Sequence, residues 1–322
     1  MFPSVLTRRT FLNASAWLAV AGETFARPVA ARQAAPRRRE LTWAELPLER
    51  WRGEAYRALV LYPGPPTGDR LYPGLLLFHG RGESRSPELG LHAWRTRYGL
   101  EPNDARLASP PLMLTEDERR YIQPEQLRAL EDALRKDPFA GLVYICPFTP
   151  NPHRGRSPGA LLDGYSDWLE QVLLPAARAH APLAPASLGV DGCSMGGFVA
   201  AEVFARKPHL FQTFGVVQPA FGQHRNEGYA DHLARALGSG SLRGIHLETS
   251  TRDPYRGSVE ALGRELGRRG ARFDLDVLPG PHDQSWLRAT GTLAMLAWHE
   301  RLLRAGSAGG RSAALDCGAT PR

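Results

Sequence analysis

Short apolar runs of strand length recur along the chain, and Gly, Pro or charged residues separate them. Such runs are typical of buried strands that are joined by turns and loops. We expect seven strands, over residues 58–62, 74–78, 142–146, 188–190, 214–217, 245–248 and 273–278.

Between most of these runs, apolar residues recur at intervals of three and four, which is the pattern of an amphipathic helix. Strands and helices in alternation predict an α/β fold, with a mostly parallel, twisted sheet and helices on both of its faces. Residues 82–140 contain no strand candidate, so we expect them to form an insertion of helices and loops over one edge of the sheet. The predicted helices cover residues 123–135, 164–180, 195–206, 257–269 and 284–303.

The length of 322 residues, 43% of them hydrophobic, is enough for one large globular domain or two small ones. We place one folded α/β domain at residues 41–305. Gly, Ala and Ser dominate residues 306–322, which predicts a flexible tail.

Residues 1–35 have the features of an export signal followed by a linker. Thr7-Arg8-Arg9-Thr10-Phe11-Leu12 resembles the twin-arginine signal, and the apolar run at 14–22 is too short to span a bilayer. This resemblance implies passage through the twin-arginine translocase as a folded protein, cleavage within residues 26–35, and a periplasmic or secreted product without stable membrane insertion. The alternative is a frayed basic tail.

The basic charge does not predict a nucleic-acid partner. Residues 1–40 contain seven Arg and two Glu, so they contribute +5 of the formal net charge of +7. Lys136 and Lys207 are the only lysines among the 40 basic residues, which indicates a general preference for Arg over a phosphate-binding surface. The three cysteines are scattered, and neither an HExxH nor a paired CxxC motif occurs, so we expect no metal and no cofactor.

The most specific motif is Gly192-Cys193-Ser194-Met195-Gly196-Gly197, between a predicted strand and a predicted helix. This context is that of a nucleophile elbow, where a sharp turn exposes a serine and only small residues fit two positions to either side. The Met195 amide, at the start of the helix, would point toward an oxyanion. The alternative is an ordinary glycine-rich turn before a helix.

A serine nucleophile needs a base and a carboxylate that orients the base. His282 is the candidate base, because it follows the last predicted strand through a Pro-Gly-Pro turn. Asp253 is the candidate carboxylate, because it follows the strand at 245–248, whereas Asp283 is better placed to cap the final helix. We expect four other histidines at the solvent or at helix ends: His92, His180, His209 and His299.

A second oxyanion donor is expected after the strand at 74–78, which leads into His79-Gly80-Arg81-Gly82. The Arg81 amide is the first candidate and the Gly80 amide the second, and we expect His79 to brace this loop. Ser194, Asp253, His282 and this turn all follow the carboxyl ends of predicted strands, where open parallel sheets bind ligands. The order Ser, Asp, His along the chain is that of α/β-hydrolases.

On these residues, positions 74–303 resemble the esterase D-like branch of the α/β-hydrolases, which includes feruloyl and acetyl esterases, S-formylglutathione hydrolases and mycolyltransferases. The match rests on the His79 to Gly82 turn, the GxSMGG elbow, Asp253 ahead of Tyr255, and Gly280-Pro281-His282-Asp283 followed by Trp286. The chain departs from this branch at Gln284, where an aromatic residue is frequent, and in the insertion at 82–140.

The resemblance implies a serine carboxylic-ester hydrolase with a Ser194-Asp253-His282 triad, an acyl-enzyme intermediate, and a small-molecule or polysaccharide-linked ester as substrate. An acyltransferase on the same fold and a catalytically silent binding protein are the alternatives. In the sheet order of this family, the strand ending at His79 separates the strands that end at Cys146 and Cys193. Disulfides span Cα distances of about 4.4–6.8 Å and the separation would be about 10 Å, so we expect buried free thiols.

Overall fold

The computed structural model describes residues 39–64, 70–154 and 157–312. The twin-arginine signal and linker predicted at residues 1–35 lie outside the described residues, so export stays a prediction. Among the described residues, no helix combines the length and the apolar character that crossing a membrane requires.

The centre of the fold is a sheet of eight strands, in which all seven predicted strands are present. The first two pairings, of β1 with β2 and of β2 with β4, are antiparallel, and every later pairing is parallel. The mostly parallel sheet is therefore confirmed. The strands, in their order across the sheet, are β1 (Leu41–Glu45), β2 (Ala58–Pro63), β4 (Val143–Pro147), β3 (Tyr72–Phe78), β5 (Leu183–Gly192), β6 (Thr213–Val217), β7 (Gly244–Arg252) and β8 (Asp274–Pro281).

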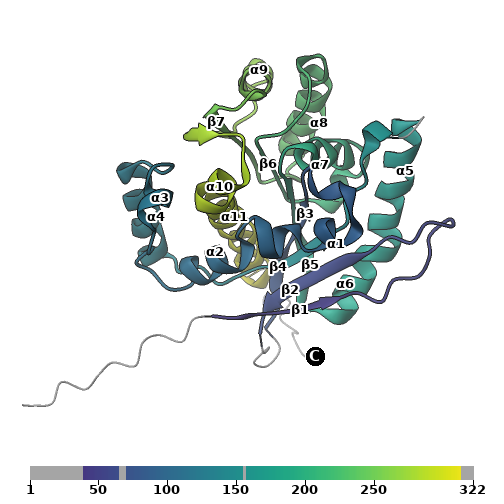
Figure 1. Ribbon diagram of the computed structural model, residues 1–322, viewed down its shortest axis with the longest axis horizontal. Coiled ribbons are helices and arrows are strands. Elements are labelled where there is room, and N and C mark those ends of the chain that lie inside the picture. The colour runs from purple at the N-terminus through teal and green to yellow at the C-terminus, as the bar shows by residue number, and fades with distance from the viewer. Residues whose placement is uncertain (1–38, 65–69, 155–156, 313–322) are drawn as a thin grey trace, which may run out of the picture. The chain divides into compact units, whose positions relative to one another are not determined.

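Two apolar cores lie on opposite faces of this sheet, as the alternation of side chains along β3 requires. Leu76 and Phe78 pack into one core, and Leu75 and Leu77 pack into the other. Helices covering both faces are thereby confirmed (Figure 1). The first core receives side chains from α5 (Pro158–Trp168), α6 (Leu174–His180), α7 (Met195–Arg206), α8 (Asn226–Gly238) and α9 (Arg256–Arg268), and the second from α1 (Pro87–Leu91), α2 (Leu100–Leu107), α4 (Pro124–Lys136), α10 (Gln284–Trp286) and α11 (Thr292–Ser312).

Residues 82–140, all of which are described, form helices and loops without a strand. Besides α1, α2 and α4 they contain short turns at Glu83–Arg85 and Ala93–Arg97 and the helix α3 (Glu116–Arg119). Helix α2 packs against α11, and the Tyr144 hydroxyl on β4 donates to Asp104 at 2.6 Å. The insertion is thus anchored on the face that carries α11.

The structure differs from the sequence expectations in two additional elements and in the course of two helices. The sequence does not predict strand β1 or helix α8, because β1 is a half-exposed edge strand and α8 begins in a polar stretch. The helix expected at 164–180 contains a wider turn at Leu169–Leu173, just before Pro175 removes a backbone donor. Helix α11 continues to Ser312, past the tail predicted from residue 306, because extending a formed helix needs no new nucleus. The domain boundaries at 41 and 305 stay predictions.

Candidate active site

Ser194 stands on a sharp turn between β5 and α7. Its backbone has φ 55° and ψ −120°, a conformation that costs a non-glycine residue about 1–3 kcal/mol. Two backbone hydrogen bonds tie it to the end of β6 and the residues that follow: the Ser194 amide donates to the Val217 carbonyl at 3.1 Å, and the Ser194 carbonyl accepts from the Ala220 amide at 2.8 Å. The predicted elbow is therefore present and is fixed by the end of β6.

Two glycines are required around this turn because the backbone passes too close for a side chain. A Cβ on Gly192 would lie 2.3 Å from the Gly196 carbonyl oxygen, and a Cβ on Gly196 would lie 2.2 Å from the Phe78 carbonyl oxygen. Gly192 is therefore required by close contact within the turn, and Gly196 by close contact with the end of β3.

The three residues selected from the sequence form one hydrogen-bonded line. His282 Nε2 lies 3.0 Å from the Ser194 hydroxyl oxygen, and His282 Nδ1 lies 2.8 Å from Asp253 Oδ1. A carboxylate oxygen accepts, so Nδ1 carries the proton and Nε2 is free to accept from the serine. The Asp253 side chain is fully buried, while 23% of the His282 side chain is exposed, which leaves the imidazole accessible from outside.

Asp253 is held by two further donors. The Tyr255 amide donates to Oδ1 at 2.9 Å, and the Thr249 hydroxyl donates to Oδ2 at 2.6 Å. Together with His282, these groups satisfy the buried carboxylate and fix the plane in which it meets the imidazole.

The segment around His282 is held from both sides. Gln218 Nε2 donates to the Pro281 carbonyl at 2.9 Å, and the Ser250 hydroxyl donates to the same oxygen at 3.2 Å. On the other side, the Asp283 side chain accepts from the Trp286 amide at 2.8 Å and caps α10, which confirms its predicted role. The contribution of Gln218 was not predicted, although its place directly after β6 could have indicated it.

The two candidate oxyanion donors on the loop after β3 differ in their partners. The Gly80 amide donates to the Tyr98 hydroxyl at 3.1 Å, so that amide is already engaged. Within the described part of the chain, the Arg81 amide has no acceptor, and the Met195 amide lies at the first position of α7, where no intrahelical acceptor exists. The structure thus favours Arg81 and Met195 over Gly80 as free donors.

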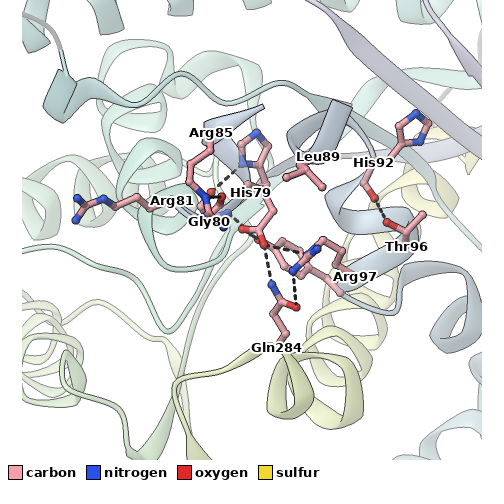
Figure 2. Close-up of polar contacts among 12 residues, drawn as sticks. His79, Gly80, Arg81, Arg85, Leu89, His92, Thr96, Arg97 and Gln284 are labelled. Atoms are coloured by element: carbon pink, nitrogen blue, oxygen red, sulfur yellow. Dashed lines mark hydrogen bonds and ion pairs between the residues drawn. The ribbon is translucent and has the colours of Figure 1, made fainter. Parts of the chain in front are cut away.

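His79 braces the loop, as predicted (Figure 2). Its Nδ1 donates to the Gly80 carbonyl at 2.9 Å, and its Nε2 accepts from the Thr149 amide at 2.8 Å. Burial lowers the pKa of His79 to about 4, so the imidazole is neutral at pH 7 and each nitrogen has one role. His79 thereby ties the ends of β3 and β4 together.

The expectation that His299 lies at the solvent or at a helix end is wrong. His299 is fully buried in α11, where Nε2 lies 3.0 Å from Asp191 Oδ2 and Nδ1 lies 2.8 Å from the Thr213 hydroxyl. Burial raises the pKa of Asp191 to about 8 and holds the pKa of His299 well below its usual value. At pH 7 both groups are therefore largely neutral, and they form a structural pair behind the elbow strand.

The cysteines on the central strands have the predicted arrangement. Strand β3 separates Cys146 on β4 from Cys193 at the end of β5, and both thiols are buried and free. Burial raises the pKa of each thiol well above its usual value. Among the residues that the structure describes, no group of three or more His, Cys, Asp or Glu side chains is placed to hold a metal ion.

A cavity of about 510 Å³ lies between α4 and α11, and none of the residues of the hydrogen-bonded line contributes to its lining. Its walls include Leu130, Leu134, His246 and Trp298. Trp286, four residues after His282, is buried in the second core, whereas the Tyr255 ring is exposed and lies 5.7 Å from the His282 ring.

No protein-family model and no curated protein matches the sequence. Among solved structures, a ferulic acid esterase aligns with a TM-score of 0.60 at 13% identity, over 82% of this chain and 99% of the esterase. An S-formylglutathione hydrolase of Staphylococcus aureus aligns with a TM-score of 0.54 at 14% identity, over 83% and 99%. A fluorophosphonate-binding serine hydrolase of the same bacterium aligns with a TM-score of 0.55 at 12% identity, over 81% and 98%. With the strand order and the helices on both faces, these likenesses show that the chain has the α/β-hydrolase fold.

Proposed function

We propose that the protein is a serine carboxylic-ester hydrolase in which Ser194, His282 and Asp253 are the catalytic triad. The observation that carries this proposal is the hydrogen-bonded line from the Ser194 hydroxyl through His282 to the buried Asp253 carboxylate. The strained backbone of Ser194 supports it, because such strain is concentrated at functional sites. The structural neighbours, which include esterases and serine hydrolases, support the same reaction class.

In the proposed reaction, His282 Nε2 takes the hydroxyl proton as Ser194 Oγ attacks the ester carbonyl carbon. The amides of Met195 and Arg81 donate to the oxyanion of the tetrahedral intermediate. The intermediate collapses, His282 returns the proton to the leaving alcohol, and the acyl group stays on Ser194. Water, deprotonated by His282, then releases the acid and restores the serine. Throughout, Asp253 holds His282 in the tautomer that has its proton on Nδ1.

The proposed substrates are small-molecule or polysaccharide-linked esters. A structural neighbour was solved in complex with ferulic acid and another with sinapinate, so aromatic acid esters belong in the first substrate panel. Export through the twin-arginine translocase to the periplasm or the medium is part of the proposal and rests on the Thr7-Arg8-Arg9-Thr10-Phe11-Leu12 motif and the short apolar run at 14–22.

The test is hydrolysis of p-nitrophenyl esters from acetate to palmitate, beside feruloyl and acetylated-sugar esters, with and without added alcohol acceptors. We expect Ser194→Ala and His282→Ala each to lose several orders of magnitude in kcat, and the double variant to lose little more. Ser187→Ala is the matched control, because Ser187 lies on the same strand and donates to the Leu303 carbonyl away from the site. Full activity in Ser194→Ala would reject the proposal, and transfer to acceptors outrunning hydrolysis would replace it with an acyltransferase.

A further inference from the structure

A buried carboxylate lies beside the candidate oxyanion loop and takes no part in the proposed reaction. Glu83 Oε2 accepts from the Tyr98 hydroxyl at 2.5 Å, and Oε1 accepts from Gln284 Nε2 at 2.7 Å. Arg97 Nε lies 3.2 Å from Oε1, and Arg97 Nη2 donates to Gln284 Oε1 at 3.2 Å. Figure 2 shows Arg97 and Gln284 turned toward each other near Gly80, whereas the Arg81 side chain points away from them.

The exposure of these groups shows how the cluster is oriented. Only 6% of the Glu83 side chain is exposed, against 40% of the Arg97 side chain. The carboxylate therefore faces the interior, where its oxygens bind Tyr98 and Gln284, and the guanidinium balances its charge from the solvent side.

The Tyr98 hydroxyl determines which groups donate and which accept in this cluster. Burial raises the pKa of Tyr98 well above its usual value, so the hydroxyl keeps its proton. Because a carboxylate can only accept, Tyr98 donates to Glu83, and a lone pair of the same oxygen is left to accept from the Gly80 amide. The chain of hydrogen bonds therefore runs from Gly80 through Tyr98 to Glu83.

Both ends of this chain lie next to the proposed machinery. Gly80 directly precedes Arg81, and a Cβ on Gly80 would lie 3.7 Å from Ser194 Cβ and 3.1 Å from the Tyr98 hydroxyl oxygen. At the other end, Gln284 follows His282 by two residues. Glu83 thus connects the loop after β3 with the segment that carries the proposed base, although 201 positions separate it from Gln284.

We propose that Tyr98 and Glu83 are positioning residues. By engaging the Gly80 amide, they hold the following peptide so that the Arg81 amide faces the oxyanion, and through Gln284 they hold that loop in register with His282. This inference rests on the proposed esterase activity. It predicts that the cluster acts on the transition state and not on substrate binding, because the ester carbonyl develops its negative charge only during the reaction.

Tyr98→Phe tests the inference with the least change in shape. The variant leaves the Gly80 amide without an acceptor and Glu83 Oε2 without a donor. Loss of a whole oxyanion donor costs about 100- to 1,000-fold, so we expect a loosened donor to lower kcat by about 10- to 100-fold, with KM within about twofold. A trifluoromethyl ketone, to which Ser194 adds to form a stable oxyanion, should lose affinity in proportion to kcat/KM.

Tyr229→Phe is the matched control. Tyr229 donates to buried Glu202 at 2.5 Å, and Arg225 pairs with that carboxylate at 2.7 Å, so the chemistry of the two clusters is the same. Glu202 lies eight residues along α7 from Ser194, about 12 Å along the helix axis. We expect Tyr229→Phe to lower the Tm to a similar extent and to leave kcat and ketone affinity unchanged.

A second pair of variants keeps the test decisive if Tyr98→Phe folds poorly. Glu83→Gln keeps an acceptor for Tyr98 and should retain more of kcat than Glu83→Leu. The inference is wrong if Tyr98→Phe has the parent kcat and ketone affinity, if Tyr229→Phe loses as much kcat, or if Glu83→Gln and Glu83→Leu are equal. An active Ser194→Ala variant would instead remove the proposed function itself.

Discussion

Asp253→Asn tests the role of the Asp253 charge in the proposed triad, because the groups around Asp253 determine the orientation of the new side-chain amide. The backbone donor of Tyr255 points at Oδ1, so the amide oxygen must occupy that position. The amide nitrogen then takes the place of Oδ2, where the Thr249 hydroxyl can turn to accept from it. His282 keeps its proton on Nδ1 and still donates to Oδ1, and the substitution removes only the negative charge.

The size of the loss follows from that charge. An imidazolium and a carboxylate about 4 Å apart attract each other by about 4 kcal/mol at an effective dielectric constant near 20. Since about 1.4 kcal/mol corresponds to a factor of ten in rate, kcat should fall about 1,000-fold. In chymotrypsin-like serine proteases, Asn in place of the triad Asp inverts the histidine tautomer and lowers kcat about 10,000-fold.

The assay is kcat for the best p-nitrophenyl ester at saturation, for Asp253→Asn and Asp253→Ala. Asp276→Asn is the control, because Asp276 also meets a histidine, His246, at 3.0 Å but lies outside the site. A loss of about 10,000-fold or more would show that the tautomer is inverted and that the argument from Tyr255 is wrong. A loss below tenfold would exclude Asp253 from the proposed role.

Three further predictions follow from burial and close packing. Gly196→Ala should cost about 1–3 kcal/mol of unfolding free energy in urea titrations and most of kcat, because its Cβ would lie 2.2 Å from the Phe78 carbonyl oxygen, and full activity would contradict the elbow geometry. Asp191, whose pKa is raised from 3.8 to about 8, holds a proton in the folded state that it releases on unfolding, so its stabilising effect is lost as the pH rises. Below pH 6.5 the buried neutral His299 opposes this trend. Between pH 6.5 and 8 Asp191 should therefore lower the unfolding free energy by about 2 kcal/mol, and Asp191→Asn should reduce the total fall by that amount. Buried Glu248, whose pKa is also raised, adds to the fall in both proteins. Cys146 and Cys193 should resist iodoacetamide at pH 8 until denaturant is added, and alkylation of either thiol in the folded protein, seen by peptide mass spectrometry, would contradict their burial.

Much of the fold could be predicted because its signals are local. Each of the seven expected strands is a short apolar run, and the elbow around Ser194 is prescribed by backbone contacts that only glycine permits. Asp253 and His282 could be selected because parallel strands bring their carboxyl ends to a common edge. The edge strand β1 gave no such signal, since a half-exposed strand needs no continuous apolar run.

The remaining features depend on partners that are far apart in the sequence. From the sequence, His299 has the features of a helix-end residue. Its partner, Asp191, lies 108 positions earlier in the chain, and only the folded structure brings the two together. Tyr98 and Glu83 lie in an insertion without a recognisable pattern, and their connection to Gln284 arises only when the loop after β3 packs beside α10. A sequence identifies such groups as polar residues but does not indicate which of them are buried together.

The central claim is that Ser194 is a nucleophile activated by His282. It can be tested most directly by treating the folded protein with a fluorophosphonate and locating the adduct by peptide mass spectrometry. The account predicts a single stoichiometric adduct on Ser194 that disappears in His282→Ala. An unlabelled Ser194 in protein shown to be folded, or labelling that persists unchanged without the imidazole, would contradict it.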